Sequence, residues 1–172
     1  GVIGILFKDT VELAGTMLVV PGICLLITSV FLVIADYADE GTKRPREASY
    51  VNAGLIGVAQ GIATMPGLSR SGTTITACLL CGFEKKFAVK YSFIMSIPAV
   101  LGAVVLELKD VAKAPLQASA VPACAVATVI SAIVGYLSIC IMMRLIQGKK
   151  YKIFAVYCAI VGLITVGYGI FR

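Results

Sequence analysis

The chain of 172 residues contains no histidine, and only 14% of its residues are charged. The missing imidazole and a lone Cys-x-x-C at Cys78 and Cys81 argue against a zinc site, which needs clustered thiolate or imidazole ligands. With so few charged residues and 59% hydrophobic ones, the chain is too apolar to be a soluble single domain. The composition instead predicts a polytopic membrane protein.

Long apolar runs predict an all-α fold. Four runs have roughly the 20 residues that a transmembrane helix needs. They are residues 15–35, 87–106, 117–143 and 153–171. Segment 51–83 is split by Pro66 and Arg70 into halves that are each too short to cross a bilayer. We therefore expect a single membrane domain over residues 1–172, with about four transmembrane helices and a re-entrant helix-turn-helix at 51–83.

The positions of the lysines and arginines indicate how segment 51–83 lies in the membrane. If it re-enters, ten cations outside it share one side and four lie opposite; if it crosses, the division is eight to six. The positive-inside rule favours re-entry, and the net charge of +6 then reflects loops rather than a nucleic-acid partner. The ten are Lys43, Arg44, Arg46, Lys85, Lys86, Lys90, Arg144, Lys149, Lys150 and Lys152.

Residues 66–74 read Pro-Gly-Leu-Ser-Arg-Ser-Gly-Thr-Thr and interrupt the apolar sequence with a charge. An arginine at membrane depth costs roughly 2.5 to 3.5 kcal/mol, so it is normally retained for a partner or a ligand. We expect a helix over about 51–65 to end at Pro66 and Gly67. A second helix, capped by Ser69 or Ser71, should then run to about residue 83.

This arrangement predicts a phosphate site, because helix N-termini attract anions and a guanidinium binds two phosphate oxygens at once. Since irregular backbone at membrane depth needs protein or a water-filled cavity around it, the turn should line a cavity. The contributing residues would be Arg70, the hydroxyls of Ser69, Ser71, Thr73 and Thr74, and Gly72, which allows close approach. The alternative is a plain polar turn whose arginine extends to the lipid headgroups. Gln60 either bonds a neighbouring helix or contacts the substrate beside Arg70.

The run from Gly57 to Thr74 resembles the second signature of the undecaprenyl-diphosphatase family, also called bacitracin-resistance proteins. Residues 91–103 resemble the helix that follows in the family, and residues 4–10 resemble a segment upstream. The resemblance covers nearly the whole chain and corresponds to roughly the C-terminal two-thirds of a typical member. We therefore expect the chain to belong to a longer product, which its first residue, Gly1, also suggests.

The resemblance implies a multi-pass phosphatase of the bacterial inner membrane. It would hydrolyse undecaprenyl diphosphate to undecaprenyl phosphate and phosphate, recycling the carrier lipid for cell-wall synthesis. Arg70, Ser69 and Thr74 would be its catalytic residues, and Ser71, Gly72 and Thr73 would shape the loop. A divalent cation, Mg²⁺ or Ca²⁺, is implied by the resemblance alone. The family's N-terminal signature, with paired glutamates and a Ser-Ser-Thr-Gly-His run, has no counterpart, so this chain alone should hold half of an active site.

Transport is the alternative interpretation. A re-entrant loop with an arginine at its tip also suits an anion channel, a carrier or a polyprenyl-phosphate flippase. A glutamate-rich re-entrant segment with a histidine, encoded upstream of Gly1, would favour the enzyme. A homodimer stays open, because lipid-facing and protein-facing helix surfaces are equally apolar.

Overall fold

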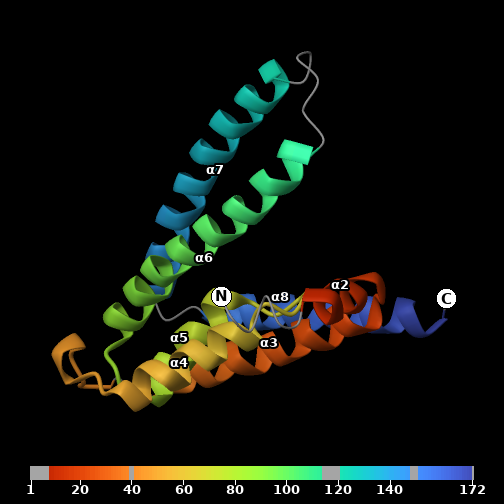
Figure 1. The fold of residues 1–172 in the computed structure, drawn as a ribbon. Helices are drawn as coiled ribbons and strands as arrows, with labels where there is room; N and C mark the ends of the chain where they lie inside the picture. The colour runs from red at the N-terminus through yellow and green to blue at the C-terminus, as the bar shows by residue number, and fades with distance from the viewer. Residues whose placement is uncertain (1–7, 39–40, 114–120, 148–150, 172) are drawn as a thin grey trace.

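The computed structural model describes residues 8–38, 41–113, 121–147 and 151–171. These residues are mainly helical and contain no strand, apart from an isolated pairing of Lys43 with Phe83. The all-α prediction is therefore confirmed. In chain order (Figure 1), the elements are α2 (Lys8–Thr16), α3 (Val19–Tyr37), the short 3-10 helix η1 (Pro45–Glu47), α4 (Tyr50–Ile62), α5 (Arg70–Leu80), α6 (Lys85–Lys113), α7 (Val121–Gln147) and α8 (Tyr151–Phe171).

Four of the described helices are long and apolar enough to cross a membrane, as predicted. The candidate spans are Val19–Tyr37, Lys85–Val105, Val121–Ile141 and Tyr151–Phe171. The first begins later than expected because α2 ends at Thr16, and Met17 and Leu18 separate it from α3. Together with their composition, these helices make the chain a multi-pass membrane protein.

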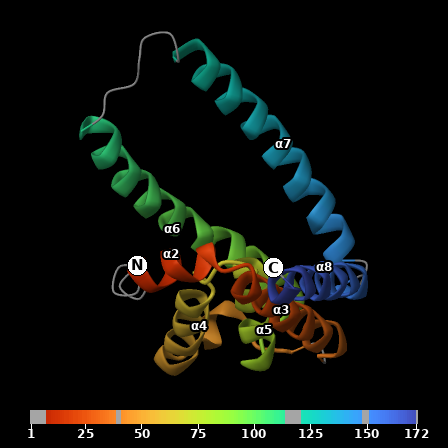
Figure 2. The ribbon, with the colours of Figure 1, turned by 90° about the vertical axis from the view of Figure 1, so that its right-hand side faces the viewer.

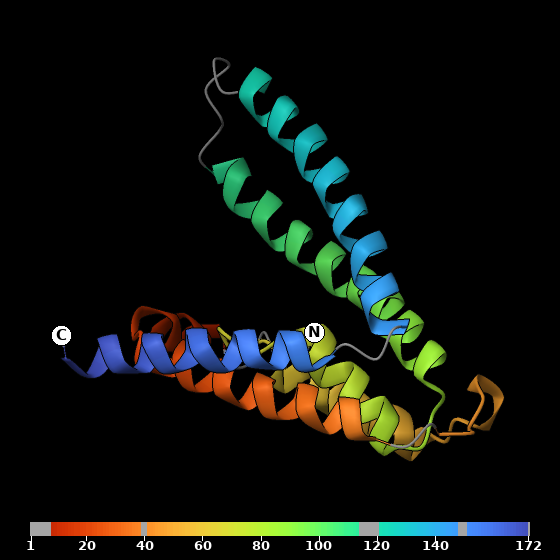
Figure 3. The same ribbon diagram turned by 180° about the vertical axis from the view of Figure 1, so that it is seen from behind.

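Helices α3 and α8 form the central antiparallel pair, with α8 lying along α3 (Figure 3). Small residues let the two backbones approach: a Cβ added at Gly162 would stand 3.0 Å from the carbonyl oxygen of Gly22. The hydroxyl of Ser29 donates a hydrogen bond to the carbonyl of Ala155 at 2.8 Å. These contacts make the pair the support for the elements around it.

Helices α4 and α5 form the hairpin predicted at 51–83. Its two ends are joined, because the amide of Lys43 donates to Gly82 at 3.0 Å and the amide of Glu84 donates to Lys43 at 3.3 Å. The ammonium of Lys43 also donates to the carbonyl of Cys81 at 3.0 Å. The chain thus enters and leaves the hairpin at one end of the bundle. With 13 and 11 residues, neither helix is long enough to cross a bilayer.

Both hairpin helices are shorter than the sequence predicts. Helix α4 ends at Ile62 rather than residue 65, and the hydroxyl of Thr64 donates to the carbonyl of Gly61 at 2.8 Å in the turn that follows. Helix α5 ends at Leu80 rather than residue 83, because Gly82 adopts φ +85°. The amides of Gly82 and Phe83 then bond back to Leu79 and Cys78, a pattern that closes a helix C-terminus.

Helix α6 packs on the hairpin only through its first half. Ala88, Val89 and Ser92 are buried, whereas Val100 and Leu101, beyond Pro98, are exposed. Every described side chain of α7 is exposed or half-buried. Figure 2 shows both helices rising away from the bundle of α2–α5 and α8. Their apolar surfaces suit contact with lipid or with another protein segment.

Four of the ten predicted same-side cations meet at one end of the bundle. Lys43 bonds the loop after α5, and Arg44 lies 3.9 Å from the carboxylate of Glu84. The ammonium of Lys152 lies 3.8 Å from Asp36, and that of Lys85 lies 5.8 Å from the ring centre of Tyr151. This clustering agrees with the charge division that favours re-entry.

Single cysteines should report this topology in a variant whose native cysteines have been replaced. Thr42→Cys and Lys86→Cys should react with a membrane-impermeant maleimide from the same face of the membrane. Lys113→Cys should react from the opposite face, because the 29-residue helix α6 is long enough to cross. Labelling of positions 42 and 86 from opposite faces would show that the hairpin crosses the bilayer.

Candidate functional site: the N-terminus of α5

The turn between α4 and α5, residues 63–69, lies against the central helix α3. The amide of Ser69 donates to the hydroxyl oxygen of Thr28 at 3.0 Å. That hydroxyl lies 3.0 Å from the carbonyl of Cys24 and 3.3 Å from the carbonyl of Gly67. Since Thr28 stands near the middle of the 19-residue helix α3, the turn lies at about half the depth of a membrane span.

Gly67 gives the turn its close approach to α3. Its φ of +88° is a left-handed conformation that glycine adopts without strain. A Cβ added there would overlap the backbone of Pro21. The Pro66-Gly67 pair lies in the turn, four residues beyond the end of α4 at Ile62 and not at the helix end as predicted, and Gly67 packs the turn on its support.

Of the two serines predicted as caps, Ser69 is the N-cap of α5. Its hydroxyl accepts a hydrogen bond from the amide of Gly72 at 3.1 Å, and its carbonyl accepts one from the amide of Thr73 at 2.9 Å. Within the described residues, the amides of Arg70 and Ser71 have no hydrogen-bond partner. These two N–H groups, at the positive end of the helix dipole, are available to an anion.

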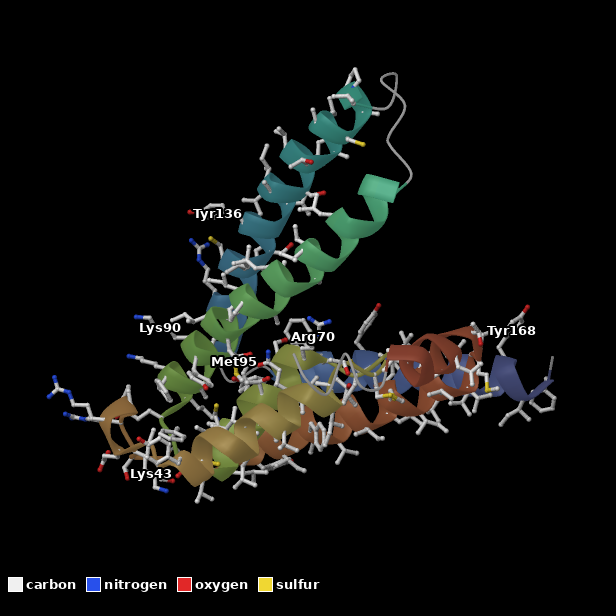
Figure 4. The ribbon with its side chains drawn as sticks, viewed as in Figure 1. Lys43, Arg70, Lys90, Met95, Tyr136 and Tyr168 are labelled. Atoms are coloured by element: carbon white, nitrogen blue, oxygen red, sulfur yellow. The ribbon has the colours of Figure 1, made fainter. Side chains whose placement is uncertain are left out.

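Arg70 is the first residue of α5, and its side chain is exposed. In Figure 4 it projects from the bundle towards the side on which α6 and α7 rise, while Lys43 lies at the opposite end of the hairpin. No carboxylate pairs with Arg70 among the side chains that the structure describes. The guanidinium is thus placed to bind a ligand beside the two available amides.

The hydroxyl residues of the motif divide into two groups. The oxygens of Ser69 and Ser71 lie 3.4 Å apart at the start of the helix, and both residues are half-buried. Thr73 and Thr74 are buried. The hydroxyl of Thr74 donates to the carbonyl of Arg70 at 2.8 Å, whereas that of Thr73 has no partner in the described part of the chain. The structure therefore gathers the predicted motif on the first turns of α5, with Thr73 able to donate a further bond.

Gly72 and Gln60 have contacts of their own. Gly72 is buried, and a Cβ there would lie 3.1 Å from the hydroxyl oxygen of Ser69, so the glycine leaves room for the cap. The amide nitrogen of Gln60 lies 3.4 Å from the carbonyl of Met95 and donates to it, joining α4 to α6. This is the bond across helices that the sequence allows; contact of Gln60 with a substrate stays a prediction.

Thr28 is the site-supporting residue that the sequence analysis missed. It lies in an apolar run more than 35 residues before the motif, and a threonine inside a helix usually bonds its own backbone. Its buried hydroxyl makes that bond, to Cys24, and also connects α3 to the turn. The sequence feature that could have pointed to Thr28 is a hydroxyl group within an apolar membrane span.

The described residues do not fit the implied divalent cation. They contain no cluster of three or more histidine, cysteine, aspartate or glutamate side chains. The α5 turn offers a guanidinium and amide donors, whereas Mg²⁺ and Ca²⁺ require several oxygen ligands, mainly carboxylates and carbonyls. The α5 turn is therefore a site for an anion and not for a metal ion.

Comparison with known proteins gives a consistent result over nearly the whole chain. The family model described as bacitracin resistance protein BacA matches residues 1–164. The chain is similar to an undecaprenyl-diphosphatase of Methanosphaera stadtmanae, at 41% identity over 96% of this chain and 59% of the relative. It is also similar to undecaprenyl-diphosphatases of Methanobrevibacter smithii, at 42% identity over 96% and 59%, and Halothermothrix orenii, at 38% over 96% and 64%. The chain spans about three-fifths of the length of these relatives.

Proposed function

The chain belongs to the family of bacitracin resistance protein BacA, and from this premise we propose that its gene product is a membrane lipid diphosphatase. It hydrolyses undecaprenyl diphosphate to undecaprenyl phosphate and inorganic phosphate. The observation that carries the proposal is the α5 N-terminus, where an exposed Arg70 and two available amides face one small region at about half the depth of a membrane span. The names of the similar proteins support the same activity.

Arg70 binds the diphosphate through two parallel N–H···O bonds. The amides of Arg70 and Ser71 add donors whose direction is fixed by the helix. As the terminal phosphoryl group passes to water and undecaprenyl phosphate leaves, negative charge redistributes over the phosphate oxygens, and fixed donors stabilise it without reorganising. The resemblance also assigns Ser69 and Thr74 to the catalytic group, in contact with the diphosphate. In the structure Ser69 caps α5 and the buried Thr74 bonds the carbonyl of Arg70, so both hold the first turn of the helix in place.

The substrate-binding group consists of Ser71, Gly72, Thr73 and Gln60. The hydroxyl of Ser71 lies beside that of Ser69 at the start of α5. The hydroxyl oxygen of Thr73 is buried and has no partner among the described residues, so it reaches a phosphate oxygen only if the first turn of α5 moves. The prenyl chain lies among apolar helix surfaces such as the exposed Ile94 and Ile97 of α6. The enzyme works in the cytoplasmic membrane, where it returns carrier lipid to cell-wall synthesis.

Phosphate release tests the proposal. The complete gene product, purified in detergent, should release inorganic phosphate from undecaprenyl diphosphate and from farnesyl diphosphate. Undecaprenyl phosphate should appear in equal amount when the lipid products are separated. Movement of the lipid or of anions across vesicles without any phosphate release would contradict the diphosphatase and favour transport.

A further inference from the structure

Thr28 connects the central helix to the site through a single hydroxyl group. Resting on the proposed function, we propose that Thr28 is a positioning residue, which sets the direction of the α5 N-terminus and so places Arg70 and the free amides on the diphosphate. Thr28 does not touch the substrate in this account. Its action passes through the backbone of Ser69 and Gly67.

The hydrogen bonds of Thr28 go beyond what its own helix requires. A buried threonine in a helix is satisfied by donating to the carbonyl four residues earlier, here Cys24 at 3.0 Å. The oxygen of Thr28 also accepts the amide of Ser69 at 3.0 Å, and Ser69 is the residue that caps α5. The carbonyl of Gly67, at 3.3 Å, is a second acceptor for the hydroxyl proton. The hydroxyl thus contacts both sides of Leu68 in the turn.

The amide of Ser69 depends on this contact. Neither Ser69 nor the turn offers it another acceptor among the described hydrogen bonds. An unpaired amide in an apolar interior is unfavourable, so the turn would rotate to find a partner if the hydroxyl were removed. Because Arg70 and Ser71 follow directly in the chain, their amides and the guanidinium would move with it.

A second threonine joins the same two helices without touching the turn. The hydroxyl of Thr76, on α5, donates to the carbonyl of Phe31 on α3 at 3.0 Å and lies 2.8 Å from the carbonyl of Gly72. Thr28 and Thr76 are both buried, with 1% and 3% of their surface exposed. They therefore form a matched pair: each connects α3 to the second half of the hairpin, Thr76 through α5 and Thr28 through the turn, and only Thr28 bonds the cap residue.

Thr28→Val, Thr28→Ser and Thr76→Val in the complete gene product test the inference. Valine keeps the shape of threonine and removes the hydroxyl. Thr28→Val should lower kcat for farnesyl diphosphate hydrolysis by about tenfold to a hundredfold, since small misplacements of catalytic groups have effects of this size. Thr28→Ser, which keeps the hydroxyl, should stay within about threefold of the parent, as should Thr76→Val.

Thermal unfolding in detergent separates positioning from stability. Both valine variants should lower Tm and still be folded at the assay temperature; Thr28→Val should lower Tm more, because it also leaves the amide of Ser69 without an acceptor. A kcat for Thr28→Val equal to that of Thr76→Val, or a failure of serine to restore it, would overturn the positioning role. If the parent protein releases no phosphate, the proposed function fails instead, so the two failures are distinguishable.

Discussion

Replacing Arg70 by alanine is expected to lower the rate of undecaprenyl diphosphate hydrolysis by at least about a thousandfold, the effect typical of an arginine that stabilises phosphoryl-transfer charge. Arg70 is exposed at the first position of α5 and has no carboxylate partner among the described side chains. Its removal should therefore leave folding and membrane insertion nearly unchanged. Arg70→Lys should recover little activity, because an ammonium cannot reproduce two parallel bonds to one phosphate.

Arg44→Ala is the matched control for this variant. Arg44 is also an exposed arginine, with 80% of its side chain accessible, but it lies in the loop before α4, where its guanidinium is 3.9 Å from the carboxylate of Glu84. Its replacement should leave hydrolysis unchanged. The measurement is phosphate release per mole of protein whose folding has been checked by size-exclusion chromatography. Near-parental turnover in Arg70→Ala or Arg70→Lys would refute the role assigned to the guanidinium.

Gly67→Ala is expected to have the second largest effect, on stability and activity together. The left-handed φ of +88° costs a side chain roughly 1 to 2 kcal/mol, and the added Cβ would also overlap the backbone of Pro21. Backbone cannot move aside as a flexible side chain can, so the overlap lowers the free energy of unfolding by roughly a further 1 to 3 kcal/mol. The turn should move away from α3 and carry Arg70 with it.

Gly82→Ala isolates the contribution of the overlap. Gly82 has a similar φ, +85°, but a Cβ there would meet only the flexible side chain of Lys43, at 3.6 Å. This variant should show the strain of the backbone alone and keep its activity. Tm and phosphate release measured for both variants provide the test. Equal losses of Tm in the two would mean that the contact between Gly67 and Pro21 contributes nothing to the turn.

The sequence predicts the hairpin well because the residues that interrupt and start its helices act locally. A proline and a glycine exclude a helix from the turn, a serine caps the next helix, and each acts within a few residues of its own position. The four membrane spans are predicted for a similar reason, since length and hydropathy suffice to identify them. The candidate site is therefore predictable as far as Ser69, Arg70 and the amides that follow.

What the sequence does not predict depends on distant contacts. The bond from Ser69 to Thr28 joins residues 41 positions apart, and many hydroxyls in an apolar run would look the same. The length of α5 depends on the φ of Gly82, which Lys43 supports from the preceding loop. The placement of α7 is equally unpredictable, because its apolar residues surround the helix and mark no single packing face.

The central claim is that the α5 N-terminus, with Arg70, binds the diphosphate. The most direct test is the dissociation constant of a non-hydrolysable farnesyl methylenediphosphonate, measured by isothermal titration calorimetry on the complete gene product and its Arg70→Ala variant in nanodiscs. We expect binding to the variant to be weaker by roughly a hundredfold or more, as is typical when one partner is removed from a charge pair that the ligand buries on binding. Equal dissociation constants for the two proteins would contradict the account.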